Sequence, residues 1–213
     1  MRITEIFFSI QGESSFAGRP CVFVRTTGCN LRCVWCDTEY SFHGGRTMSV
    51  GEILDEVERV GGGCRLVELT GGEPLLQKEI GVLARRLLDR GCTVLCETGG
   101  SLPVDLLPDE VVKIVDVKCP GSGEVDANDW SNLERLDPDR DELKFVIADR
   151  ADYEWAAVRV RERGLDRFTV HFSPAFGTMD RTELAEWILR DGLPVRLNLQ
   201  IHKFLWDPAA RGV

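Results

Sequence analysis

The sequence predicts an α/β fold built on a parallel sheet. Apolar, β-rich segments alternate along the chain with segments whose apolar residues recur at helical spacing, which is typical of parallel strands joined by right-handed crossovers. Polar, glycine-rich or cysteine-rich stretches nearly all follow directly after a predicted strand. The carboxyl ends of parallel strands meet at one face, so we expect these stretches to converge in one large active site. Periodicity alone leaves open whether the sheet is open or a partly closed barrel.

In the first part of the chain, strands are predicted over residues 3–10, 21–28, 65–70 and 92–97, and helices over 50–60 and about 75–90. The first strand alternates apolar and polar residues and is followed by a glycine-containing turn, whereas the second is a continuous apolar run, as expected for a strand covered on both faces. Ser49 and Glu52 have the spacing of a capping box at the start of the first helix. Three glycines after residue 60 end that helix, and Pro74 lies near the first turn of the second.

In the second part, strands are predicted over residues 111–118, 142–148, 167–172 and 193–200, and helices over about 151–163 and 181–190.

The chain has no internal repeat, low-complexity segment or linker, so a single domain over residues 1–213 is expected.

Composition excludes several classes of protein. With 213 residues, 43% hydrophobic and 29% charged, the chain can bury a core and is neither disordered nor a coiled coil. The net charge of −9 disfavours nucleic acid or an anionic membrane as the main partner. No apolar run approaches the ~18 residues that cross a bilayer, and the first residues lack the pattern of a signal peptide. We therefore expect a soluble, cytoplasmic protein.

The chain contains eight cysteines. Thiols in a reducing cytosol stay reduced, so a cluster of them favours a metal site or catalysis over a disulfide framework. Five scattered cysteines are interpreted as small buried apolar side chains: Cys21, Cys64, Cys92, Cys96 and Cys119. The other three, Cys29, Cys33 and Cys36, follow the second strand with the spacing C-x3-C-x2-C.

Three interpretations of this spacing compete. The three cysteines also match one stripe of a helix, although Gly28 and Asn30 are poor helix formers. A structural zinc site needs four closed ligands, and His43 is the candidate for the fourth. Three thiolates suit a [4Fe–4S] cluster that keeps one iron without a protein ligand, as a catalytic cluster requires.

The cysteine loop, with Trp35 directly before the last cysteine, and the segment Gly71-Gly72-Glu73-Pro74 after the next strand resemble the radical S-adenosylmethionine superfamily. The resemblance implies a partial (βα) barrel with parallel strands and the active site at their C-terminal face. It implies a [4Fe–4S] cluster on the three cysteines, whose open iron is chelated by S-adenosylmethionine, and cleavage of that cofactor to a 5′-deoxyadenosyl radical.

Within the superfamily, the chain resembles the 7-carboxy-7-deazaguanine synthases, in segments 9–13, 23–38, 97–100, 116–120, 142–147 and 200–203. This resemblance implies a lyase of queuosine and deazapurine biosynthesis that converts 6-carboxy-5,6,7,8-tetrahydropterin to 7-carboxy-7-deazaguanine and ammonia. Two alternatives remain: a radical activase acting on a glycyl-radical protein, and a non-catalytic iron–sulfur or zinc module. The family usually has glycine after the glutamate of Gln-Gly-Glu, where this chain has Ser14 and Ser15.

The resemblance also implies roles for individual residues. Substrate contacts fall to Ile10, Gln11, Gly12, Arg25, Thr70, His202 and Pro208. Contacts with S-adenosylmethionine fall to Trp35, Cys36, Asp37, Gly72, Asp116, Val117, Lys118, Ser173, Pro174, Ala175 and Phe176. Arg25 would pair with the substrate carboxylate, and Thr38 would bind Mg²⁺. Glu97 is the catalytic candidate, although the sequence does not separate proton transfer from cofactor binding or the orientation of neighbours.

The radical must be shielded from competing C–H bonds, so Phe204 and Trp206 in the C-terminal segment are expected to act as lids. The partners implied by the resemblance are a small-molecule substrate, an electron donor such as flavodoxin and a second copy of the chain in a homodimer. No nucleic acid or membrane partner is expected.

Overall fold

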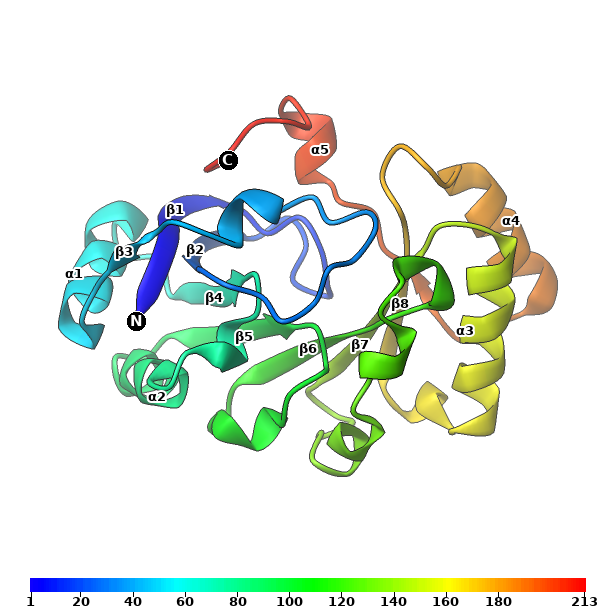
Figure 1. Ribbon diagram of the computed structural model, residues 1–213, viewed down its shortest axis with the longest axis horizontal. Helices are drawn as coiled ribbons and strands as arrows, with labels where there is room; N and C mark the ends of the chain where they lie inside the picture. Colours follow the sequence, from blue (N-terminus) through cyan, green and yellow to red (C-terminus); the bar gives the residue numbers. More distant parts are fainter.

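One nine-stranded sheet organises the computed structural model, which describes residues 1–213. The strands are β1 (Arg2–Ile10), β2 (Pro20–Thr26), β3 (Arg46–Thr47), β4 (Leu66–Gly71), β5 (Thr93–Thr98), β6 (Val112–Val117), β7 (Glu142–Ile147), β8 (Thr169–Pro174) and β9 (Arg196–Leu197). Their order across the sheet is β3-β1-β2-β4-β5-β6-β7-β8-β9, and all neighbours from β2 to β9 are parallel. The strands form a curved row (Figure 1), which confirms the predicted partial barrel.

The helices are α1 (Val50–Gly61), α2 (Ile80–Asp89), α3 (Arg150–Glu162), α4 (Arg181–Asp191) and the single turn α5 (His202–Leu205). Helices α1 and α2 lie towards the β1 end of the sheet, and α3 and α4 lie beside β7 and β8 (Figure 1). Their buried apolar side chains pack with those of the strands in a core of 40 buried residues. The predicted capping box is present at α1, where Ser49 and Glu52 each accept a hydrogen bond from the other's backbone N–H.

The parallel arrangement predicted for the sheet does not extend to the start of the chain. β1 pairs antiparallel with both β2 and β3. The physical reason is the short connection over residues 11–19, because a parallel crossover needs a dozen or more residues, usually including a helix.

Two further boundaries differ from the sequence prediction. The helix expected over about 75–90 divides into a 3₁₀ turn, Pro74–Leu76, and α2. Between them the backbone of Gln77 is extended, and its side chain bonds the N–H of Arg2 and the carbonyl of Thr27. The strand expected over 193–200 pairs only over β9, because Pro194 has no N–H to donate and the chain turns away after Leu197.

The C-terminal segment returns to the other end of the sheet. α5 lies near β1 and the loop after β2 (Figure 1). The N–H of Ile201 donates to the carbonyl of Gly12 at 3.0 Å, and Lys203 Nζ lies 2.7 Å from Asp37 Oδ2. None of the helices combines the length and hydrophobicity that a membrane-spanning helix requires.

Candidate active site

A cavity of about 920 Å³ lies inside the curve of the sheet and extends to the loops at the carboxyl ends of the parallel strands. This volume is within the range of small-molecule and cofactor sites, roughly 300–1,000 Å³. Every residue assigned to the site from the sequence lines this cavity except Val117, whose side chain is buried in the core. The prediction that the loops after the strands converge is therefore confirmed by their positions.

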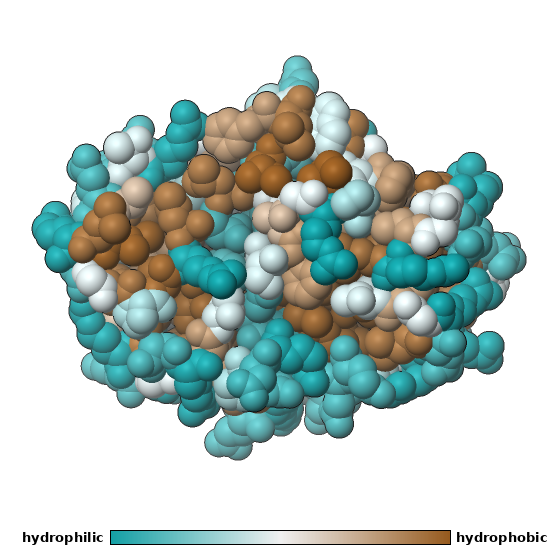
Figure 2. All heavy atoms as spheres, turned by 180° about the vertical axis from the view of Figure 1, so that it is seen from behind, coloured by the Kyte–Doolittle hydropathy of each residue, from teal (hydrophilic) through white to brown (hydrophobic).

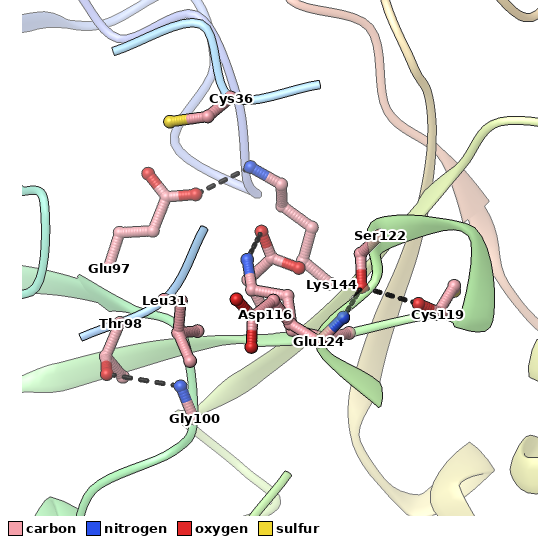
Figure 3. A network of polar contacts seen from close by, with 12 residues as sticks. Leu31, Cys36, Glu97, Thr98, Gly100, Asp116, Cys119, Ser122, Glu124 and Lys144 are labelled. Atoms are coloured by element: carbon pink, nitrogen blue, oxygen red, sulfur yellow. Dashed lines mark hydrogen bonds and ion pairs between the residues drawn. The ribbon is translucent and has the colours of Figure 1, made fainter. Parts of the chain in front are cut away.

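The cysteine loop is irregular and is held from several sides. Residues 27–38 form turns and bends without a helix, so the three cysteines do not line a helical stripe. Val34 donates its N–H to the carbonyl of Ser122 at 3.0 Å, and Arg32 donates its N–H to Glu124 Oε1 at 2.5 Å. Ser122 and Glu124 belong to the segment after β6 (Figure 3). The loop is therefore fixed by the fold before any ligand binds.

The three thiols fit an iron–sulfur cluster better than a zinc ion. All three cysteines are half-buried free thiols that line the cavity. No three cysteine, histidine or carboxylate side chains converge closely enough to hold one metal ion, and His43 is exposed outside the cavity. A cubane binds each thiolate through a different iron, so separated thiols around one cavity suit it, whereas a structural zinc site does not. Burial raises the pKa of the Cys29 and Cys33 thiols.

The Gly-Gly-Glu-Pro segment joins the cysteine loop to the loop after β5. A Cβ at Gly72 would lie 2.3 Å from the carbonyl oxygen of Gly28, so glycine is required here by the neighbouring loop as well as by any cofactor. Glu73 is buried, and its carboxylate accepts hydrogen bonds from the N–H of Leu75, the N–H of Gly99 and the hydroxyl of Thr98. Burial raises the pKa of Glu73, and these hydrogen bonds oppose the rise. Its observed role is to fix the backbone.

Three residues that line the cavity each have a buried oxygen without a hydrogen-bond partner. These oxygens are Asp116 Oδ1 on β6, Ser173 Oγ on β8 and Glu13 Oε1 in the loop after β1. The other oxygen of Asp116 lies 2.9 Å from Lys118 Nζ. Buried polar atoms are nearly always satisfied, so unpaired ones facing a cavity fit a bound polar ligand. Asp116 and Ser173 belong to the segments that were assigned to S-adenosylmethionine.

Arg25 projects from β2 into the cavity and has an internal partner. Its Nε donates to Glu5 Oε1 at 2.8 Å, and Tyr40 Oη donates to the same oxygen at 2.8 Å. The guanidinium also lies over the rings of Phe7 and Tyr40. Glu5 and Tyr40 were missed in the sequence, where only the substrate was considered as the anionic partner of Arg25. The terminal nitrogens of Arg25 have no partner within the chain.

Thr38 and Asp37 extend the cysteine loop toward the C-terminal segment. Thr38 Oγ1 lies 3.7 Å from Cys36 Sγ and lines the cavity. Asp37 contacts Lys203 Nζ at 2.7 Å and Gln200 Nε2 at 3.3 Å. Burial opposes ionisation of Asp37, but Lys203 outweighs it and lowers the pKa of the carboxyl.

Gln11, Gly12 and Glu13, in the loop after β1, form part of the cavity wall. The amide of Gln11 donates to the buried Glu68 and accepts from the N–H of Glu13 at 3.0 Å. The backbone N–H and carbonyl of Gln11 are also used within this loop. The side-chain amide of Gln11 thus has one N–H and one oxygen lone pair engaged within the chain, and Gln11 lines the cavity. Gly12 lies so close to His202 that a Cβ there would overlap the imidazole. Burial lowers the pKa of His202.

Sequence reasoning missed three charged residues in the same wall: Glu13, Glu68 and Lys144. Lys144 Nζ lies 2.6 Å from Glu97 Oε1 and 2.9 Å from Glu13 Oε1. Figure 3 shows Glu97 and Lys144 directed toward one another, with Cys36 on the same side of the strands. Burial raises the pKa of Glu97 and, much more, that of Glu68. A charged residue within an otherwise apolar strand was the available signal for Lys144 and Glu68.

The lid prediction for Phe204 and Trp206 is wrong. Their side chains are 52% and 37% exposed and do not line the cavity. The turn of α5 directs His202 and Lys203 inward, so Phe204 faces outward, where Arg181 lies over its ring. The cavity is instead bordered by residues 207–213, including Pro208. Arg211 in this segment lies over the ring of Tyr40.

Comparisons with known proteins agree with this geometry. The family model of the radical SAM superfamily matches residues 23–190. The chain is 53% identical to the 7-carboxy-7-deazaguanine synthase of Koribacter versatilis, which it covers in full, and 48% identical to that of Chlorobaculum tepidum, over 100% of this chain and 97% of the relative. Its fold matches the crystal structure of QueE from Escherichia coli with a TM-score of 0.76 at 26% identity, over 93% of each chain.

A more distant match, the structure of TYW1 with a lysine-pyruvate adduct bound, has a TM-score of 0.57 at 13% identity over 80% of this chain and 73% of that one, and it supports the fold alone. The cysteine loop, the barrel and the full-length relatives lead to one assignment. The chain belongs to the 7-carboxy-7-deazaguanine synthase family of the radical S-adenosylmethionine superfamily.

Proposed function

We propose that the chain converts 6-carboxy-5,6,7,8-tetrahydropterin to 7-carboxy-7-deazaguanine with release of ammonia, as a lyase that supplies deazapurine biosynthesis. The observation that carries the proposal is the convergence of three free thiols, unpaired polar atoms and the Arg25 guanidinium on one cavity. The full-length identity to synthases of this name supports the same reaction. Nothing in the cavity favours an activase, and none of the relatives reported above bears that name.

Cys29, Cys33 and Cys36 would hold a [4Fe–4S] cluster, and Asp116 and Ser173 would hold the S-adenosylmethionine bound beside it. Together these groups supply, when bound, the carbon radical that removes hydrogen from the substrate. The chain's own contribution is to bind, orient and exclude water. The loops that close the cavity keep competing C–H bonds and solvent away from the reacting carbon.

We propose that Arg25 binds the substrate carboxylate. Its Nε is occupied by Glu5, which fixes the plane of the guanidinium and leaves the terminal nitrogens for the ligand. A guanidinium and a carboxylate match in bidentate geometry. Thr38 would offer its hydroxyl to a Mg²⁺ ion that also takes the substrate carboxylate, since Mg²⁺ prefers hard oxygens shared with substrate and water.

Glu97 is the proposed catalytic carboxylate. It lines the cavity within reach of a bound substrate, and burial raises its pKa. Thr70 and His202 are proposed to contact the substrate, because both line the same cavity.

Four further proposals concern the chain as a whole. We propose one radical S-adenosylmethionine domain over residues 1–213, because one continuous sheet uses strands from both ends of the chain. A homodimer is supported by broad apolar areas on the rear face (Figure 2), since such patches mark protein contacts. A flavodoxin-type electron donor and a cytoplasmic location are proposed because the thiolate-bound cluster must be reduced and kept from oxidation.

The test is anaerobic reconstitution with iron and sulfide, followed by an assay with 6-carboxytetrahydropterin in the presence and absence of Mg²⁺. Formation of 7-carboxy-7-deazaguanine and ammonia is expected, and its absence would overturn the proposal. Thr38→Ala is expected to weaken the dependence on Mg²⁺ while the iron content stays that of the parent. Thr47→Ala, at an exposed position in β3, is the matched control. A metal response of Thr38→Ala equal to that of the parent would exclude Thr38 as a ligand.

A further inference from the structure

Lys144 is a buried lysine in the wall of the cavity, joined to two carboxylates that are distant in the sequence. Its side chain is 7% exposed. Glu97 comes from β5 and Glu13 from the loop after β1, and all three residues line the cavity. The lysine therefore holds together two parts of the wall that no backbone hydrogen bond connects.

The charges in this cluster do not cancel. A buried ammonium group is costly unless it is paired, and here one ammonium serves two carboxylates. Burial opposes the charge of Lys144, but Glu13 and Glu97 outweigh it and hold the pKa of the lysine well above its usual range. The neighbouring Glu68 has a pKa raised by burial and is bonded to Gln11, and Asp116 is paired with Lys118. The cluster of Glu13, Glu97 and Lys144 thus keeps an excess of hydrogen-bond acceptors.

The three residues of the cluster line the cavity, and both carboxylates keep oxygens without a hydrogen-bond donor. Lys144 Nζ donates a hydrogen bond to Oε1 of Glu97. It lies 2.9 Å from Oε1 of Glu13 without forming a hydrogen bond, so this buried oxygen also lacks a donor. Oε2 of Glu97 has no partner, and Oε2 of Glu13 has only a 3.5 Å contact with Gln200. An ionised carboxylate is an acceptor with capacity for more than one donor. The ligand that fits such a pair presents adjacent N–H groups.

We propose that Lys144 is a positioning residue, which fixes Glu13 and Glu97 so that their free oxygens accept the N–H groups of the substrate's 2-aminopyrimidinone ring. This inference rests on the proposed function, since that substrate carries an exocyclic amine next to ring N–H groups. Arg25 would hold the substrate's carboxylate, so the two interactions together would fix the orientation of the ring in the cavity.

The experiment compares Lys144→Met and Lys144→Arg in the reconstituted holoenzyme. Lys144→Met is expected to lower kcat/KM for 6-carboxytetrahydropterin by about 100-fold, mainly through KM, because removal of one partner leaves the other charges of a buried pair uncompensated. Lys144→Arg is expected to restore part of this loss. Cleavage of S-adenosylmethionine by dithionite without substrate is expected to stay at the parent level in both variants.

The matched control is Lys113→Met. Lys113 is a buried lysine on the adjacent strand β6, lies 3.7 Å from Asp141 and does not line the cavity. Its replacement is expected to lower the thermal midpoint while KM stays that of the parent. A general cost of removing a buried lysine would instead change both variants alike, and that result would overturn the assignment.

The preference between two substrates distinguishes a positioning role of Lys144 from a role in the stability of the fold. The parent is expected to prefer the natural pterin over an analogue with hydrogen in place of the 2-amino group, and Lys144→Met is expected to lose this preference. Glu13→Gln keeps Lys144 paired with Glu97 and is the second variant should Lys144→Met not fold, with the same loss expected. If the parent is active and the Lys144→Met and Glu13→Gln variants keep its KM and its preference for the 2-amino pterin, this inference alone is overturned. If the parent does not turn over the pterin, the proposed function is overturned together with the inference.

Discussion

Gly72 is the position where a single methyl group tests the packing of the site. A Cβ at residue 72 would lie 2.3 Å from the carbonyl oxygen of Gly28 and 2.9 Å from Cβ of Cys29. Ordinary contacts of a Cβ begin near 3.4 Å, so the Gly-Gly-Glu-Pro segment and the cysteine loop would have to separate by about 1 Å.

This separation lowers the free energy of unfolding in two ways. It stretches the 2.8 Å hydrogen bond from the N–H of Glu73 to the carbonyl of Gly28, whose net contribution is about 1 kcal/mol. Crowding in a well-packed region adds about 1–3 kcal/mol. Gly72→Ala is therefore expected to lower the free energy of unfolding by about 2–4 kcal/mol, and the thermal midpoint by roughly 5–15 °C for a chain of this length.

The assay is thermal unfolding of the metal-free chain, followed by circular dichroism. Gly51→Ala is the control, since its Cβ would have no neighbour closer than 3.9 Å and the position is exposed in α1. This control is expected to melt at or above the parent midpoint, because alanine favours a helix over glycine by about 1 kcal/mol. A midpoint of Gly72→Ala equal to that of the parent would refute the reasoning. A lower iron content after reconstitution is the accompanying expectation.

Two other predictions concern ion pairs outside the cluster of Glu13, Glu97 and Lys144. Burial opposes ionisation of Glu142, but hydrogen bonds from His171 and Ser15 outweigh this effect and lower the pKa of the carboxyl group. The ionised Glu142 therefore stabilises the fold above the ordinary glutamate pKa of about 4.3, and this stabilisation is lost as the pH falls through the pKa of the folded state. The stability difference between the parent and Glu142→Gln in urea unfolding is therefore expected to be larger at pH 7 than at pH 3.5, and an equal difference would contradict the assignment. Lys203→Met removes the contact with Asp37 and is expected to speed hydrogen exchange of the backbone amides in α5, whereas unchanged exchange would show that this ion pair does not hold the segment.

Elements with local signals were predictable from the sequence. The capping box and the glycines placed α1 to within a residue, since both signals act inside the helix that they bound. Most parallel strands were placed by their apolar runs. The antiparallel pairing of β1, the extended backbone of Gln77 and the short β9 depend on partners elsewhere in the fold, so composition and spacing did not indicate them.

The candidate site divides in the same way. The cysteine loop and the segments after the strands were found because their residue types follow from their chemistry. Lys144, Glu13 and Glu5 were missed because each has a role only through partners on other elements. Ser14 illustrates the same limit: its φ of 62° is the one positive value outside glycine, in the left-handed region that favours glycine. Ser15, next to it, bonds the buried carboxylate of Glu142.

The most direct test is to measure the cluster on the anaerobically reconstituted chain by iron analysis and electron paramagnetic resonance. The parent is expected to bind about four irons per chain, with a spectrum that changes when S-adenosylmethionine is added. Cys29→Ala, Cys33→Ala and Cys36→Ala are each expected to abolish that change and the formation of 5′-deoxyadenosine, while Cys64→Ala, a half-buried cysteine outside the cavity, retains both. A parent without such a cluster, or full 5′-deoxyadenosine formation in any of the three variants, would contradict the account.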